Sequence, residues 1–267
     1  MKKLNILFTI FLGISILSCS SSNGDIDENT EDIDENTEET IIVYKKATQY
    51  AQDGQFSYSN SQEVFYNTDK KIIQVVTYLA YNSSTTTTDV IYNSDEISEI
   101  SKTTTYENSN NIDIEEYDVI INNGQIKLTG VNGLDKEVQI DFTENYVDAI
   151  RTIQPSNLTT ISENLYQRNN ENNIISYTWD NNISFTYSNF DTGNVMPFHG
   201  NYWDDYFIAF ALKPSKNLPL TSTITYSSGS TNTHDIDPTM LTYDNENNII
   251  HFAYDSQNYT DYEYIEL

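Results

Sequence analysis

The hydrophobic and polar positions of the chain form short alternating runs, separated by clusters of Asn, Asp and Glu. In Leu241–Asp255 (LTYDNENNIIHFAYD), two β-prone runs flank the polar segment Asp244–Asn248. Alternation with a period of two is typical of a strand with one buried face, and Asn and Asp favour the backbone angles of tight turns. This segment therefore predicts a β-hairpin.

Looser copies of the unit recur upstream. They cover Val64–Val75, Asp89–Ile100, Tyr117–Leu128, Gln139–Ile150 and Leu165–Trp179. The spacing between copies is irregular, which suits consecutive hairpins better than a solenoid. We predict an all-β fold, an antiparallel meander that is strongly curved or closed into a barrel, because closure removes exposed sheet edges.

Two of the predicted strands differ in how their faces alternate. Val138, Ile140 and Phe142 alternate with polar residues, so we expect one face of that strand to meet solvent. In Ile72–Tyr81 (IIQVVTYLAY) both alternating sets are apolar, which predicts a central strand covered on both faces.

An insertion near residues 190–219 breaks the hairpin pattern. Phe190–Pro219 holds three of the five prolines and one of the two tryptophans. The spacing of Tyr202, Tyr206 and Phe210 predicts one short helix over Asn201–Leu212.

Long loops in compact domains are often functional, so we place a candidate binding site on this insertion. Its residues are His199, Tyr202, Trp203 and Tyr206. The alternative is that the helix plugs one end of the sheet and buries the same rings as core. Trp203 is then buried, whereas in a binding platform it is partly exposed.

The first forty residues are unlike the rest of the chain. Lys2 and Lys3 precede the apolar segment Leu4–Leu17, which is too short to span a bilayer but suits a secretory signal. The segment runs into Ile16-Leu17-Ser18-Cys19, which resembles the lipobox of bacterial lipoproteins, and Cys19 is the only cysteine. We expect Cys19 to carry a lipid; the alternative is an ordinary signal peptide with an incidental cysteine.

The density of acidic residues predicts where the folded domain begins. Residues 20–40 contain two tandem copies of DIDENTE, and such dense like charge prevents folding. We therefore predict a signal peptide over 1–18, a lipidated cysteine and acidic tether over 19–40, and one β domain over 41–267. Acidic residues soon after a lipidated cysteine resemble the surface-export signals of Bacteroidota lipoproteins, so we expect an outer-membrane lipoprotein that is periplasmic or surface-exposed.

The net charge of the 267-residue chain is −27. Residues 1–40 hold nine of the 40 acidic residues and two of the 13 basic ones, so the remainder carries 31 acids and 11 bases, or −20. A body this acidic repels phosphate backbones, and nucleic acid is not an expected partner.

Aromatic residues before Asp or Asn, a polar turn and an aliphatic pair together resemble the YD-type hairpin repeats of bacterial surface proteins. From about residue 60 to 267, the hairpin series and the closing YDNENNII segment resemble an uncharacterised Bacteroidota lipoprotein family, domain of unknown function 4595. The resemblance implies a porin-like fold and supplies no catalytic residues. Charged positions such as Lys70-Lys71, Glu99 and Arg151 leave little room for an uncharged lipid-facing band, so we do not expect the strands to span a membrane.

The sequence contains none of the common catalytic motifs. His199, His234 and His251 lie far apart in sequence, and no HExxH, GxSxG, P-loop or GxGxxG segment occurs. His234, Asp235 and Asp237 offer metal-ligand atoms, but they precede Pro238 in a turn-like segment, which favours turn chemistry. We predict no metal site, no cofactor and no catalytic residue.

Two functions follow from these observations. The first is a non-enzymatic binding or scaffold lipoprotein of the cell envelope, attached to the membrane by its lipid, with a glycan or an envelope protein as partner. The second is a carbohydrate-active hydrolase that uses paired carboxylates, for which Asp204-Asp205 beside Trp203 is the best candidate. Since Asp204-Asp205 also fits the wet face of an amphipathic helix, we favour the first function.

Overall fold

The structure is a computed structural model that describes residues 42–53, 56–179, 183–195, 208–213, 215–253 and 257–267. These residues form one sheet of 17 strands and a 3-10 turn, η1. The elements are β1 (Ile42–Asp53), β2 (Phe56–Tyr66), β3 (Ile72–Leu79), β4 (Ser84–Asn93), β5 (Glu96–Tyr106), β6 (Ile112–Asn122), β7 (Gln125–Gly130), β8 (Glu137–Thr143), β9 (Tyr146–Gln154), β10 (Thr159–Arg168), β11 (Ile174–Trp179), β12 (Ile183–Val195), β13 (Asn217–Thr225), β14 (Thr231–Asp235), η1 (Pro238–Met240), β15 (Leu241–Tyr243), β16 (Ile249–Ala253) and β17 (Tyr259–Glu266).

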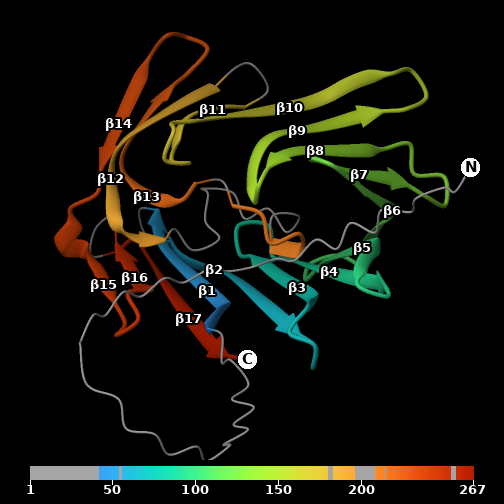
Figure 1. The fold of residues 1–267 in the computed structure, drawn as a ribbon, viewed down its shortest axis with the longest axis horizontal. Coiled ribbons are helices and arrows are strands. Elements are labelled where there is room, and N and C mark those ends of the chain that lie inside the picture. The colour runs from blue at the N-terminus through green and yellow to red at the C-terminus, as the bar shows by residue number, and fades with distance from the viewer. Residues whose placement is uncertain (1–41, 54–55, 180–182, 196–207, 214, 254–256) are drawn as a thin grey trace, which may run out of the picture. The chain divides into compact units, whose positions relative to one another are not determined.

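Successive strands pair antiparallel along the chain, and the first strand also pairs with the last, Ile42 being the register partner of Glu266. Within the described chain no ladder joins β14 to β15. The sheet therefore runs from β15 through β17 and β1 to β14, and it curves round without closing (Figure 1). The predicted all-β antiparallel meander is confirmed, as a curved open sheet and not as a closed barrel.

The break in the sheet lies at a proline. Ile236 N still donates to Leu220 O at 2.7 Å, which extends the pairing of β14 with β13. Pro238 then has no N–H to donate, and Asp237 caps the 3-10 turn by accepting from Thr239 N at 2.9 Å. After the turn the chain pairs with β16 instead. Because an even number of antiparallel pairings separates β14 from β15, the two strands run in the same direction and cannot continue the meander.

The polar clusters of the repeat form turns of one kind. At three of them the first residue is Asn or Asp, and its side chain accepts from the backbone N–H groups two and four residues later, at 2.7–3.0 Å. The fourth residue has positive φ. These turns are Asn67–Lys71, Asn169–Asn173 and Asp244–Asn248. The acceptor oxygen explains why Asn or Asp opens each turn.

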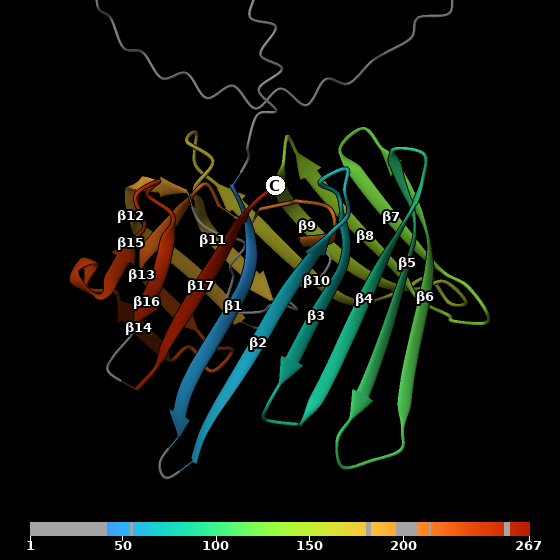
Figure 2. The ribbon, with the colours of Figure 1, turned by 90° about the horizontal axis from the view of Figure 1, so that it is seen from below.

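Tyrosines beside these turns hold neighbouring strands together. Tyr66 donates its hydroxyl to Tyr44 O at 2.5 Å, Tyr92 to Ile72 O at 2.9 Å and Tyr264 to Ile249 O at 3.1 Å. All of these strand ends lie at the same end of the sheet, which we call the tyrosine end (the top of Figure 2). Burial raises the pKa of the hydroxyls of Tyr66, Tyr92 and Tyr264.

The core lies on the concave face of the sheet. Val75, Leu128, Ile140 and Val147 are 0% exposed. On β8 the buried Val138 and Ile140 alternate with the partly exposed Gln139, so the predicted solvent-facing side of this strand is confirmed.

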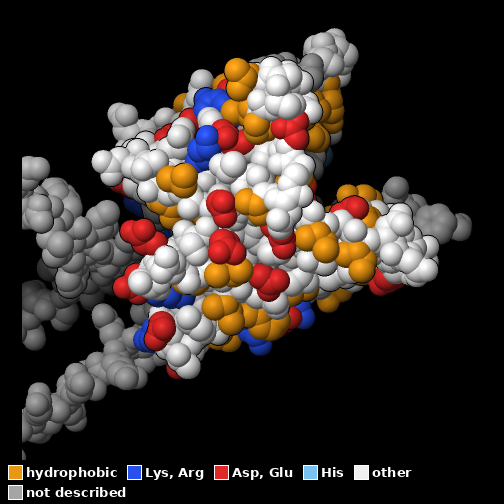
Figure 3. All heavy atoms as spheres, turned by 90° about the vertical axis from the view of Figure 1, so that its right-hand side faces the viewer, with side chains coloured by type: hydrophobic (Ala, Val, Ile, Leu, Met, Phe, Trp, Pro, Cys, Tyr) orange, Lys and Arg blue, Asp and Glu red, His pale blue; other side chains and the backbone are white. Residues whose placement is uncertain are grey.

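None of the described elements forms a second layer over the convex face. Ile73 is 38% exposed, so the prediction that Ile72–Tyr81 is covered on both faces is wrong. Side chains on this face are partly buried by their neighbours on adjacent strands. Figure 3 shows its hydrophobic side chains in separate groups among carboxylates. Ile112, Ile114 and Ile120 of β6 are exposed.

The end of the insertion that the structure describes lies in the core. Ile208, Ala209 and Leu212 are buried in the main hydrophobic cluster, and Ile208–Ala209 form a helical turn. Lys213 N donates to Asn145 O at 2.8 Å. Of the helix predicted over Asn201–Leu212, residues 201–207 lie outside the described residues.

A buried polar contact fixes the chain after the insertion. Ser215 Oγ accepts from Ile174 N at 3.0 Å, and Asn173 Oδ1 accepts from Asn217 N at 2.9 Å. These bonds tie the return of the insertion to the start of β11. In the described part of the chain, no helix has the length and hydropathy needed to cross a membrane.

Candidate functional site

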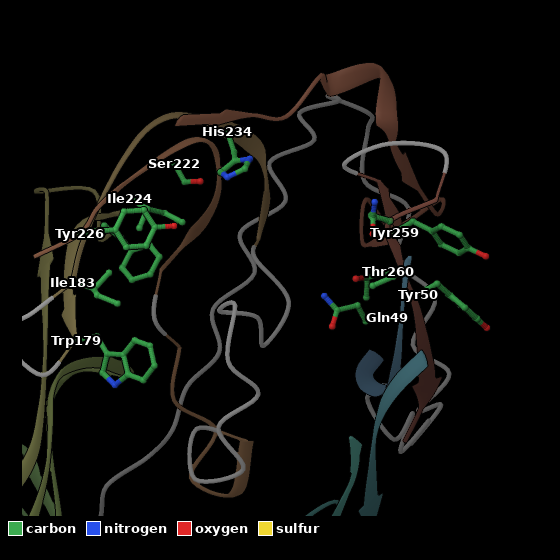
Figure 4. Close-up of a pocket in the computed structure, with 13 residues that line it drawn as sticks. Gln49, Tyr50, Trp179, Ile183, Ser222, Ile224, Tyr226, His234, Tyr259 and Thr260 are labelled. Carbon is green, nitrogen blue, oxygen red and sulfur yellow. The ribbon is translucent and has the colours of Figure 1, made fainter. Parts of the chain in front are cut away.

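A hollow of about 560 Å³ lies on the concave side of the sheet, near the opening left by β14. One wall comes from β1 and β17, and the other comes from β11 to β14 (Figure 4). We call it the seam hollow. Its described lining consists of Gln49, Tyr50, Ala51, Trp179, Ile183, Phe185, Ser222, Ile224, Tyr226, His234, Asn258, Tyr259 and Thr260.

One wall of the seam hollow is aromatic and aliphatic. Tyr177 on β11 and Phe185 on β12 are register partners whose ring centroids lie 5.3 Å apart, and Phe185 is in turn the partner of Ile224 on β13. Trp179 pairs with Ile183 in the next step of the same face. Strand alternation thus brings the apolar side chains of three neighbouring strands onto one wall.

The opposite wall carries amide and hydroxyl groups. Gln49 on β1 is the register partner of Thr260 on β17, and both side chains point toward the gap between the walls in Figure 4. Asn60 Nδ2 donates to Gln49 Oε1 at 3.1 Å, and Asn60 Oδ1 accepts from Ala80 N at 2.9 Å. Asn60 therefore fixes the amide plane of Gln49 and leaves its Nε2–H groups facing the hollow.

Tyr50 and Tyr259 border the hollow through their backbones. Their rings point away from it in Figure 4 and stack on each other, with centroids 4.7 Å apart. The ring of Tyr259 also lies 5.3 Å from that of His251. This aromatic group belongs to the convex face, so it is not part of the hollow.

His234 stands at the free edge of β14, opposite Ser222 in register. Its Nε2 lies 3.0 Å from Asn232 Nδ2. Asp235 accepts from the Thr221 hydroxyl at 2.7 Å, and Asp237 caps η1. The prediction that this segment uses its acids for turn chemistry is confirmed at Asp237. No group of three or more His, Cys, Asp or Glu side chains in the described residues is placed to hold a metal ion.

The described lining of the seam hollow combines apolar side chains with a few polar groups. No Asp, Glu, Lys or Arg occurs among its described lining residues, so this lining offers no carboxylate as an acid or a nucleophile. Apolar faces with a few fixed polar groups are typical of small-molecule sites, whose volumes run from about 300 to 1,000 Å³.

Two carboxylates that share one cationic partner lie outside the seam hollow. On the convex face, Arg151 contacts both Asp141 and Glu163. Burial alone would raise the pKa of the Asp141 carboxyl, but Gln125 and Arg151 outweigh it and hold that pKa below its ordinary value. A glycosidase acid needs a raised pKa, so this pair fits an ion-pair role and not a catalytic one.

His199, Tyr202, Trp203 and Tyr206 lie outside the described residues, as do Cys19 and Asp204-Asp205. Of the described lining of the seam hollow, the sequence analysis singled out only His234, as a metal-ligand candidate that it set aside. A signal was present in SYTW and SFTYS, where aromatic side chains alternate with Ser or Thr. It marks an aromatic face without showing that the face lines a hollow.

Comparisons with known proteins find similarity in structure alone. The sequence matches no protein-family model and no curated protein. A porin-like protein from Bacteroides vulgatus, 12% identical, aligns over 84% of this chain and 99% of its own with a TM-score of 0.41. A porin-like protein from Bacteroides uniformis, 11% identical, aligns over 83% of this chain and 98% of its own with a TM-score of 0.38.

Proposed function

We propose that the protein is a non-enzymatic binding module of the cell envelope, held to a membrane by a lipid on Cys19, and that its ligand occupies the seam hollow. The observation that carries the proposal is the pairing of two unlike walls. An aromatic and aliphatic wall faces Gln49 and Thr260 across a hollow of suitable volume.

The hydrolase alternative has less support. Two carboxyl groups within about 10 Å of each other are the minimum for glycoside hydrolysis by the common routes. The described lining of the seam hollow has none. The envelope location is inferred from the signal-like segment before Cys19 and from the acidic tether over residues 20–40.

The test is native mass spectrometry of the full chain after incubation with the saccharide, peptide and lipid fractions of an envelope extract. We expect one fraction to add a discrete mass to the protein, and the ligand to be recovered unchanged. Ser222→Trp, which fills the hollow, should abolish the added mass. Thr223→Trp, on the opposite face of the same strand, is the matched control and should retain it.

The results that contradict the proposal are specific. Equal capture by the protein and by Ser222→Trp moves the site away from the seam hollow. Release of a shortened ligand, with capture lost in Asp204→Asn or Asp205→Asn, favours the hydrolase.

A further inference from the structure

We propose that the ligand of the seam hollow is a neutral saccharide, whose sugar rings stack on the aromatic wall while Gln49 and Thr260 bind its hydroxyls. The inference rests on the proposed function and specifies the ligand class of the same site. It is carried by the polar groups of the opposite wall.

Thr260 is the first of these groups. The residue is 1% exposed, and its hydroxyl has no hydrogen-bond partner among the described residues. A threonine hydroxyl can both donate and accept a hydrogen bond. A sugar hydroxyl that reaches this point can do the same, so the two groups match.

Gln49 is the second. Its Oε1 is occupied by Asn60 Nδ2, whereas its Nε2 has no partner in the described part of the chain. Because Asn60 is itself held by Ala80 N, the two donors of Gln49 are fixed in direction before a ligand arrives. Fixed donors favour a ligand rich in acceptor oxygens.

The facing wall supplies the other half of a sugar site. Tyr226 is 40% exposed at the rim, and its ring lies beside Ile183 and Ile224 in Figure 4, with Trp179 further along the same wall. Flat aromatic faces take the apolar C–H face of a pyranose ring, while the hydroxyls at its edge remain free to bond elsewhere. An alkyl chain fits this wall but leaves Gln49 and Thr260 unsatisfied.

Charge excludes acidic ligands. The described lining has no Lys or Arg to pair with a carboxylate, sulfate or phosphate. Residues 41–267 carry a net charge of −20, from 31 acids and 11 bases, and so repel polyanions. The saccharide therefore carries no anionic groups.

The experiment is calorimetric titration of the full chain with maltohexaose, cellohexaose, mannohexaose and xylohexaose, with hexagalacturonate as the charged counterpart. We expect at least one neutral hexasaccharide to bind and hexagalacturonate not to bind. Gln49→Leu and Thr260→Val each remove hydrogen-bonding groups at nearly constant volume, so each should raise the Kd roughly three- to tenfold. Tyr226→Ala should raise the Kd about tenfold.

Thr223→Val is the matched control, because it removes a hydroxyl from the opposite face of β13 and should leave the Kd unchanged. Far-ultraviolet circular dichroism of each variant checks folding. If Gln49→Leu or Thr260→Val unfolds, Tyr226→Ala still tests the site, because Tyr226 is exposed and its replacement should leave the fold intact. Any one of three results overturns the inference. They are binding of hexagalacturonate, Kd values for Gln49→Leu and Thr260→Val that equal that of the unchanged protein, and no binding of any of the four neutral hexasaccharides. A peptide or lipid captured in the mass-spectrometric experiment overturns it while the proposed function stands; no capture at all removes both.

Discussion

The hydroxyl of Tyr243 on β15 donates to Oδ2 of Asp191 on β12 at 2.5 Å. These strands share no ladder in the described chain, and the bond spans the side of the sheet where β14 and β15 fail to pair. Tyr66, Tyr92 and Tyr264 at this end each donate to the carbonyl of an adjacent strand. Among the described strands only β16 pairs with β15, and Tyr243 donates to a carboxylate instead, so the break is bridged at the tyrosine end.

Tyr243→Phe should therefore destabilise the domain more than the same change at a tyrosine within the continuous sheet. A hydrogen bond to a charged acceptor contributes about 1.5–3 kcal/mol, against about 0.5–1.5 kcal/mol for a neutral one. Tyr92→Phe, whose hydroxyl donates to the neutral Ile72 O, is the control. Urea unfolding measures both, and hydrogen exchange in Tyr243→Phe should rise first at Leu241–Tyr243. Equal losses for the two variants would show that the bridge has no special role.

Alkaline pH should unfold the domain cooperatively. Burial raises the pKa of several hydroxyls at the tyrosine end; they belong to Tyr44, Tyr66, Tyr92 and Tyr264. A group whose pKa is raised by folding stabilises the protein fully below its unfolded pKa, about 10 for tyrosine, and that stabilisation is lost as pH rises toward the folded pKa. Phenolate absorbance and circular dichroism should thus change together above about pH 10. Ionisation of all the tyrosines near pH 10 with no change in circular dichroism would contradict this expectation.

The described end of the insertion should behave as core. Ile208 is 2% exposed, so Ile208→Ala should cost about 2–5 kcal/mol of unfolding free energy. Ile120 on β6 is 51% exposed, and Ile120→Ala should change stability by less than about 0.5 kcal/mol. Thermal and urea unfolding compare them. A small loss for Ile208→Ala would mean that the insertion can leave the core without cost.

The proposed lipid anchor and the predicted tether can be tested apart from the fold. Cys19→Ala should move the protein from the membrane to the soluble fraction, because no other cysteine can take its lipid. Deleting Asp25–Glu39 should leave the melting temperature nearly unchanged, since a charged tether buries little surface. Membrane retention of Cys19→Ala would show that the lipobox interpretation is wrong.

The fold could be predicted from the sequence because the sequence signals for turns and strands are local. The turn at Asp244–Asn248 needs an acceptor at its first residue, and the turn at Asn123-Gly124 needs positive φ, which Gly124 adopts at 76°. Period-two alternation then fixes which residues share a face. These rules act within a hairpin, and hairpins account for most of the ladders of the sheet.

The seam hollow could not be predicted from the sequence, because it depends on contacts between residues that are distant in the chain. Gln49 and Trp179 come from strands that are far apart in the chain, and only the curvature of the whole sheet sets them face to face. Alternation also gives no sign of which face is concave, since Ile73 and Ile120 are as apolar as the core residues. The sequence predicts a turn at Pro238. Whether the strands on either side of it, β14 and β15, can pair antiparallel depends on how many strand pairings separate them round the sheet.

The pairing of β1 with β17 has a consequence for how the protein is made. Ile42 cannot pair with Glu266 until β17 is in place, and contacts between such distant segments slow folding because the loop must close first. During that interval one edge of β1 is unpaired and open to association with other chains. A circular permutant that joins Leu267 to Ile42 by a short linker and opens at Asn123-Gly124 turns this pair into a hairpin. It should fold faster than the native order of strands while reaching the same sheet.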